Sequence, residues 1–138
     1  LYDMTDEKIR EKLKELLVDE QEISATLIDR VKRFVRLTKD GKVIFMTAKD
    51  KLPLRSQIML YLAGKRFAKE LGLIETDVSS IEEISASLSA DYFVVAARLK
   101  ELKDQQMVLA VERGGYTVQL AKLNESLDAV EKSFVNKS

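Results

Sequence analysis

The chain has 138 residues, 46% of them hydrophobic and 33% charged, so it can fold as one ordinary domain with a small appended unit and is too apolar to be disordered. Cysteine and histidine are both absent, which excludes disulfides, Cys/His zinc sites and the commonest general base, and we expect no metal, no cofactor and no enzymatic activity. The 23 basic and 23 acidic side chains give a net charge of zero. The sequence shows neither a membrane-spanning apolar run nor a signal peptide, so we expect a cytoplasmic protein without membrane contact.

The charges are distributed unevenly along the chain. Residues 30–69 carry 12 basic and two acidic side chains, residues 1–29 carry four basic and nine acidic ones, and residues 70–91 carry six acidic and no basic ones. Such segregation can create a basic face that attracts phosphates in a protein of zero net charge. The alternative is that the acidic N-terminal segment pairs with the basic middle segment. The scarcity of Asn and Gln beside Lys, Arg and Glu is also typical of some heat-adapted, thermophile proteins.

Two helices are predicted at the N-terminus. Thr5 or Asp6 can cap the first, which carries one apolar stripe, and the second begins at about Ile23. We expect the two to pack together as an αα-hairpin. The apolar positions are Ile9, Leu13, Leu16 and Leu17 on the first helix and Leu27, Ile28 and Val31 on the second.

The hydrophobic pattern then changes to alternation around Asp40-Gly41. Residues 35–37 and 43–45 flank this pair, and Asp-Gly tolerates the backbone of a tight turn, so a β-hairpin is predicted. A helix that continues through Val35 is the rival interpretation. Next, Pro53 marks the start of a long apolar helix over residues 55–71, which Gly72 ends.

The second half of the chain predicts two helices, a hairpin and a final helix. Ser79 or Ser80, followed three residues on by Glu82 or Glu83, forms a capping box for a short helix over 80–88. After a break at Ser89-Ala90, Asp91 can cap a helix over 91–104. Strands 107–112 and 116–120 flank Arg113-Gly114-Gly115, where glycines permit positive φ. The last helix either closes the core of this chain or pairs with a second copy in a homodimer; its apolar positions are Leu123, Leu127, Val130 and Phe134.

The order of these elements over residues 52–120 resembles a winged helix-turn-helix domain. The run VSSIEEISASLSADYFVVAARLKELKDQQMV is similar to the stretch in which that family places its short helix, turn, recognition helix and entry to the wing. The chain also resembles small archaeal winged-helix DNA-binding proteins. The resemblance implies a mainly α fold with small β-sheets (α+β). It divides the chain into an N-terminal αα-hairpin and β-hairpin subdomain over 1–50 and a winged helix-turn-helix domain with a C-terminal helix over 51–138.

By this resemblance, the protein binds double-stranded DNA as a transcription regulator or a chromosome-associated factor. Residues 91–103 would be the recognition helix, and Arg98 would read a base, because a guanidinium can make paired hydrogen bonds to guanine. The wing tip over 113–116 would meet the DNA backbone or minor groove. The residues expected to contact DNA are Lys51, Arg55, Tyr92, Arg98, Lys100, Lys103, Arg113 and Tyr116.

One feature departs from a typical DNA reader. The presumed reading surface carries Tyr92, Phe93, Val94 and Ala97, where such proteins commonly have polar residues. We expect Phe93, Val94 and Ala97 to be buried, because most apolar residues on a helix belong to a core. The alternative is an apolar partner surface, which would make the chain a winged-helix protein-interaction module of a larger complex. Two roles are also open for the Tyr116 side chain: it stacks on nucleic acid, or it packs against a side chain of the neighbouring strand.

Overall fold

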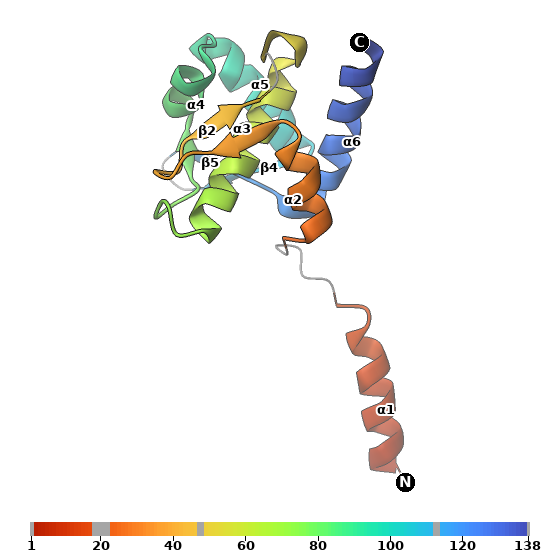
Figure 1. The fold of residues 1–138 in the computed structure, drawn as a ribbon. Coiled ribbons are helices and arrows are strands. Elements are labelled where there is room, and N and C mark those ends of the chain that lie inside the picture. The colour runs from red at the N-terminus through yellow and green to blue at the C-terminus, as the bar shows by residue number, and fades with distance from the viewer. Residues whose placement is uncertain (1, 18–22, 47–48, 112–113, 138) are drawn as a thin grey trace.

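The computed structural model describes residues 2–17, 23–46, 49–111 and 114–137. These ranges form a mainly helical fold with two small antiparallel sheets, which confirms the expected α+β class (Figure 1). In chain order the elements are α1 (Tyr2–Lys14), α2 (Ala25–Lys32), β1 (Val35–Leu37), β2 (Val43–Phe45), the 3-10 helix η1 (Lys49–Lys51), α3 (Leu54–Glu70), β3 (Ser79–Ser80), α4 (Ile81–Leu88), α5 (Tyr92–Asp104), β4 (Val108–Val111), β5 (Gly115–Val118) and α6 (Leu120–Lys137).

Helix α3 is the central element of the fold. It begins directly after Pro53, as the sequence predicts, and it is in contact with α2, α4, α5, α6, β1, β2 and β5. Because neighbours surround it, its side chains are buried on more than one face, including Ile58, Leu60 and Leu62. An apolar helix of this kind is typical of a core position.

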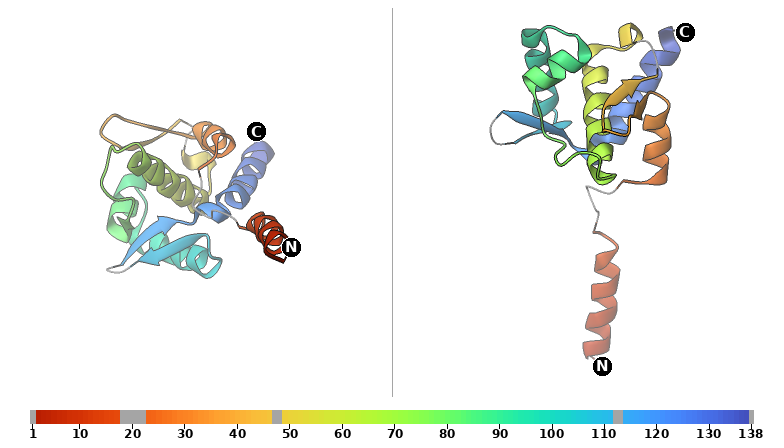
Figure 2. Two further views of the ribbon diagram at one scale, coloured as in Figure 1. Left: turned by 90° about the horizontal axis from the view of Figure 1, so that it is seen from below. Right: turned by 60° about the vertical axis from the view of Figure 1, so that its left-hand side comes forward.

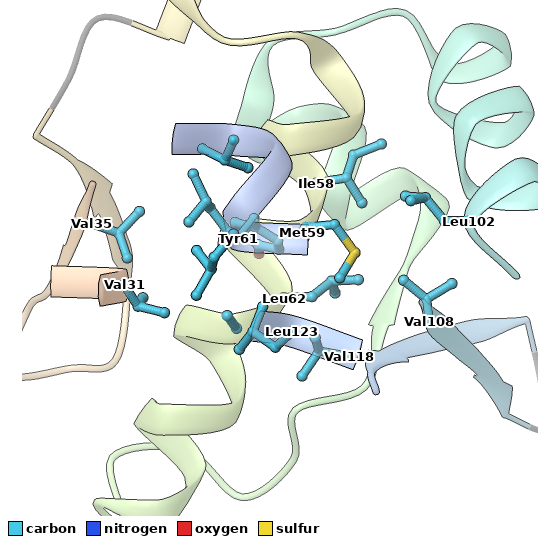
Figure 3. Packing of buried hydrophobic residues seen from close by; sticks show 14 of the residues in the cluster. Val31, Val35, Ile58, Met59, Tyr61, Leu62, Leu102, Val108, Val118 and Leu123 are labelled. Carbon is cyan, nitrogen blue, oxygen red and sulfur yellow. The ribbon is translucent and has the colours of Figure 1, made fainter. Parts of the chain in front are cut away.

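One cluster of buried apolar side chains joins the two halves of the sequence. Val31 and Val35 from the N-terminal half pack with Ile58 and Tyr61 of α3, and Leu123 of α6 belongs to the same cluster (Figure 3). Leu127 and Val130 of α6 are buried as well. The last helix therefore closes the core of its own chain, the first of the two alternatives open at the sequence level. The side chain of Phe134 lies outside the described residues.

The predicted hairpin around Gly41 is present, which rules out a helix through Val35. Strands β1 and β2 pair antiparallel, with Val35 opposite Phe45 and Leu37 opposite Val43. The turn is held by Thr38, whose hydroxyl accepts a hydrogen bond from the Lys42 backbone N–H at 3.0 Å and donates one to the Asp40 carboxylate.

The expected αα-hairpin is wrong. The apolar stripe of α1 is uncovered, with Ile9, Leu13, Leu16 and Leu17 between 52% and 77% exposed, and α1 lies apart from the other elements (Figure 1). The reason lies in α2, which has only eight residues and buries Leu27 and Val31 while contacting α3, β1 and α6. The apolar face of α2 that carries Leu27 and Val31 is thus covered by α3, β1 and α6 and is not available to α1.

Local capping signals correctly predict the next two helices. The Ser80 hydroxyl accepts a hydrogen bond from the Glu83 N–H at 3.0 Å at the start of α4, and Ser89 ends this helix with a φ of 53°. The Asp91 carboxylate then accepts hydrogen bonds from the N–H groups of Phe93 and Val94 at 3.0 and 3.1 Å. The chain thereby reverses within a few residues and begins α5.

Strands β4 and β5 form the second predicted hairpin and include β3 in one antiparallel sheet of order β3-β5-β4. Gly114 has the expected positive φ, +72°, whereas Gly115 is required for another reason. A Cβ atom on Gly115 would clash with Cγ1 of Val78, so glycine lets β5 pass close to the segment before β3. Among the described residues, no helix is both long and apolar enough to cross a membrane.

Candidate nucleic-acid interface

Helix α5 has one buried face and one exposed face. Val95, Leu99 and Leu102 are almost completely buried and attach the helix to the core. Figure 2 shows α4 and α5 as a pair near the β4–β5 hairpin, with α3 next to them. Since consecutive helical residues point about 100° apart, the side chains between these three anchors face outward. The outward face of α5 is therefore a defined surface on a rigid support.

Two lysines provide the free positive charge of this surface. Lys100 and Lys103 are exposed, and neither forms an ion pair among the residues that the structure describes. Arg98 differs, because its Nη2 atom lies 3.1 Å from Oε1 of Glu101, one helical turn away. Its Nε atom is buried and has no hydrogen-bond partner within the described residues. Arg98 is therefore partly committed to a neighbour before any ligand binds.

The two cations expected near phosphates lie at the end of η1 and in the first turn of α3. Lys51 is exposed at the end of η1, and Arg55 donates a hydrogen bond to the side chain of Gln105, directly after α5. The structure thus brings Arg55 to the C-terminal end of α5. It does not bring Arg55 to the N-terminal half, which would enter a DNA groove if α5 were the recognition helix.

The expectation that Phe93, Val94 and Ala97 are buried is wrong. Phe93 is 77% exposed, Tyr92 40% and Val94 47%, and Ala97 is exposed as well. The rings of Tyr92 and Phe93 meet edge to face, with centroids 5.3 Å apart. The inner side of α5 is already filled by its three anchor residues, which leaves these four side chains outside. We call Tyr92, Phe93, Val94 and Ala97 the α5 apolar patch.

The hairpin β4–β5 contributes less than expected. Arg113, a predicted DNA contact, lies outside the described residues. Tyr116 is half-buried, packs against the core cluster and stands opposite Ala110 and Ser79 in the sheet. Of its two alternatives, the structure favours packing across the strands.

The acidic residues of segment 70–91 pair with the basic residues of α3. Lys65 lies 3.6 Å from Glu83, Lys69 3.5 Å from Asp77, and Arg66 2.9 Å from Glu70. Within the described residues, the basic middle segment is thus partly neutralised by the segment that follows it, and no ion pair joins it to residues 2–17 or 23–29. Among the described residues, the exposed cations at α5 and η1 are the ones left to create a positive field at this surface.

Metal-binding chemistry finds no support in the described ranges, where no three His, Cys, Asp or Glu side chains form a group that could hold an ion. No protein-family model, no curated protein and no solved structure matches the chain. The geometry of α5 and its surroundings is therefore the basis for the function proposed below.

Proposed function

We propose that the chain is a winged helix-turn-helix protein that binds double-stranded DNA, either as a transcription regulator or as a chromosome-associated factor. The observation that carries the proposal is the sequence of elements α3-β3-α4-α5-β4-β5 with the sheet order β3-β5-β4. This order resembles the winged-helix architecture, in which the helix after a sharp turn enters the major groove and the following hairpin forms the wing. Helix α5 is then the recognition helix.

Phosphate contacts in this proposal come from exposed lysines. Lys100 and Lys103 on α5 and Lys51 on η1 are free to approach the DNA backbone, and each phosphate they neutralise releases counterions. Such contacts position a protein on the duplex without specifying a sequence.

Arg98 supplies the sequence-reading contact. Its ion pair with Glu101 is partly exposed, and pairs of this kind contribute about 0–1 kcal/mol. A bidentate contact of arginine to guanine is worth about 1–3 kcal/mol of discrimination. The exchange of Glu101 for a guanine edge is therefore favourable, and Arg98 should contribute to specificity more than to general affinity.

The test compares two charge-matched double variants in duplex DNA binding over a range of salt concentrations. Lys100→Ala/Lys103→Ala should reduce the slope of log affinity against log salt by about 2, since each lysine accounts for roughly one phosphate. The control is Lys39→Ala/Lys132→Ala, which removes exposed lysines from the β1–β2 turn and α6. An equal loss in both double variants, or no loss in either, would exclude α5 as the interface.

A second candidate function, a protein-interaction module, is favoured by the α5 apolar patch. Exposed aromatic and aliphatic side chains that lie together are typical of protein interfaces, where tyrosine is a frequent anchor. Phe93→Asp should then abolish co-purification of a partner and leave thermal stability unchanged. Leu109→Asp, a change of the same chemistry at an exposed position on β4, is the control and should leave the partner bound. If the chain binds only DNA, Phe93→Asp should not cause the loss of a protein partner.

A further inference from the structure

The amphipathic helix α1 has an apolar side that no other described residue covers. Ile9, Leu13, Leu16 and Leu17 recur at helical spacing along α1 and the turn that follows it, and at least half of each side chain is exposed. We call these four residues the α1 stripe. Helices of this kind gain most of their stability in proteins from covering the apolar face.

An apolar groove lies open elsewhere in the same chain, between α2, β1 and the C-terminal part of α3. Its volume is about 350 Å³. Two of its apolar residues are largely uncovered, Ile28 at 44% and Leu71 at 68% exposed. Its walls include Ile28, Val31, Val35, Leu37, Phe67 and Leu71. We call this feature the α2–α3 groove.

The α1 stripe and the α2–α3 groove are both apolar and both uncovered in the single chain. An apolar stripe at i, i+4 and i+7 is the feature by which amphipathic helices bind to hydrophobic grooves. Lys32 and Arg36 lie at the groove and form no ion pair within the described residues. Glu70 lines the groove as well, and α1 itself carries four acidic and four basic side chains, so the match between the two surfaces is apolar.

We propose that α1 of one copy of this chain occupies the α2–α3 groove of a second copy, and the reverse. In the structure α1 lies away from the groove of its own chain although that groove is open (Figures 1 and 2). Each copy offers one helix and one groove, so a reciprocal exchange covers both surfaces on both copies and closes a two-fold dimer. The interface leaves the outward face of α5 free, and the inference does not depend on DNA binding.

Engineered cysteines test this exchange directly, because the chain contains no cysteine of its own. One chain carries Leu13→Cys and the other Leu71→Cys, and the two chains differ in mass. They are mixed and oxidised under mild conditions, and the masses of the products are measured by mass spectrometry without a reducing agent. The exchange predicts a mixed disulfide dimer in excess over both like-with-like dimers. It also predicts that the unaltered chain is a dimer by light scattering.

Two matched substitutions test the surfaces independently of the disulfide. Leu16→Asp on the stripe and Leu71→Asp in the groove should each weaken the dimer by about tenfold or more, because each places a charge in a buried apolar contact. The controls are Glu11→Ala, on the opposite face of α1, and Leu109→Asp, at an exposed position on β4. Both controls should remain dimeric. Since Leu16 and Leu71 are exposed in the single chain, thermal unfolding of both variants should match that of the controls when all are diluted to monomers, and fall below it at concentrations where the controls are dimers.

Three results would overturn the proposal. A third chain carries both Leu13→Cys and Leu71→Cys, and a disulfide within its monomer, together with the absence of mixed dimers from the two single-cysteine chains, would place α1 in its own groove. Like-with-like dimers of Leu13→Cys in excess would show that the α1 helices pair with each other. A monomer at all concentrations would show that the stripe does not bind a second copy.

Discussion

Arg30 of α2 and Glu131 of α6, 101 residues apart in the sequence, are joined by two hydrogen bonds of 3.1 and 3.2 Å. The same guanidinium donates to Asp128 at 2.6 Å and to the Asn124 side chain at 2.9 Å. The pKa of Arg30 is raised, chiefly by its hydrogen bond with Glu131, so the charged form is favoured in the folded protein. The Arg30 side chain thus joins α2 to α6, the last helix of the chain.

Loss of this arginine should lower the stability of the whole fold. Arg30→Ala is expected to reduce the free energy of unfolding by about 1–2 kcal/mol, since it removes several charge-assisted hydrogen bonds at a partly buried site. The raised pKa means that Arg30 is charged at every pH below the ordinary arginine pKa. The loss of unfolding free energy should therefore be the same at pH 6 and pH 9. Denaturant unfolding measures it. Arg33→Ala, at an exposed position on the same segment, should change the stability by less than about 0.5 kcal/mol, and an equal effect of both variants would contradict the role of Arg30.

Gly64 determines how closely β2 approaches α3. A Cβ atom at this position would lie 2.7 Å from Cγ2 and 3.0 Å from Cγ1 of Val43. Alanine favours a helix over glycine by about 1 kcal/mol, but overpacking costs about 1–3 kcal/mol, so Gly64→Ala should destabilise the protein. Val43→Ala in the same chain should restore the stability by removing the clash. A double-mutant cycle from unfolding data tests this, and purely additive effects would exclude the contact.

The turn of the first hairpin should respond to pH through Asp40. Its pKa is lowered from the ordinary value of 3.8, chiefly because the Thr38 hydroxyl donates a hydrogen bond to the carboxylate. A lowered pKa means that the interaction is present above 3.8 and is lost as the pH falls through the lower folded value. Titration of the Asp40 carboxyl by NMR should show Thr38→Val raising the pKa and Thr38→Ser leaving it low. The same pKa in both variants would refute the assignment.

Stability measurements should separate the two faces of α5. Leu99→Ala removes a fully buried side chain and should cost about 2–5 kcal/mol. Phe93→Ala removes an exposed ring on the same helix and should change the free energy of unfolding by less than about 0.5 kcal/mol. A large loss on Phe93→Ala would mean that the α5 apolar patch is part of the core after all.

The sequence predicts the parts of the fold that depend on neighbouring residues. Ser80 and Asp91 accept hydrogen bonds from N–H groups two or three residues later, so their helix starts are visible in the local sequence. The pairing of Arg98 with Glu101 is likewise a local spacing, i to i+3, and could have been inferred from the sequence. The turns at Gly41 and Gly114 are likewise predicted from the residues next to them.

Features that depend on distant residues could not be predicted in this way. The capacity of α2 to bind α1 is removed by α3, β1 and α6, whose positions are not apparent from residues 1–32. The apolar character of Phe93 indicates burial, and only the packing around α5 shows that this side chain is left uncovered. The pairing of Lys65 with Glu83 similarly joins two elements that the chain brings together only on folding.

The salt dependence of duplex DNA binding is the decisive measurement for DNA recognition through α5. A labelled random-sequence duplex is titrated with the unaltered protein at several salt concentrations, and log affinity is plotted against log salt. A DNA-binding surface with free lysines at positions 51, 100 and 103 predicts binding at low salt and a linear decrease with a slope of about −0.9 for each phosphate neutralised, or roughly −3 in total. Undetectable binding at low salt, or an affinity that does not change with salt, would contradict the proposed function.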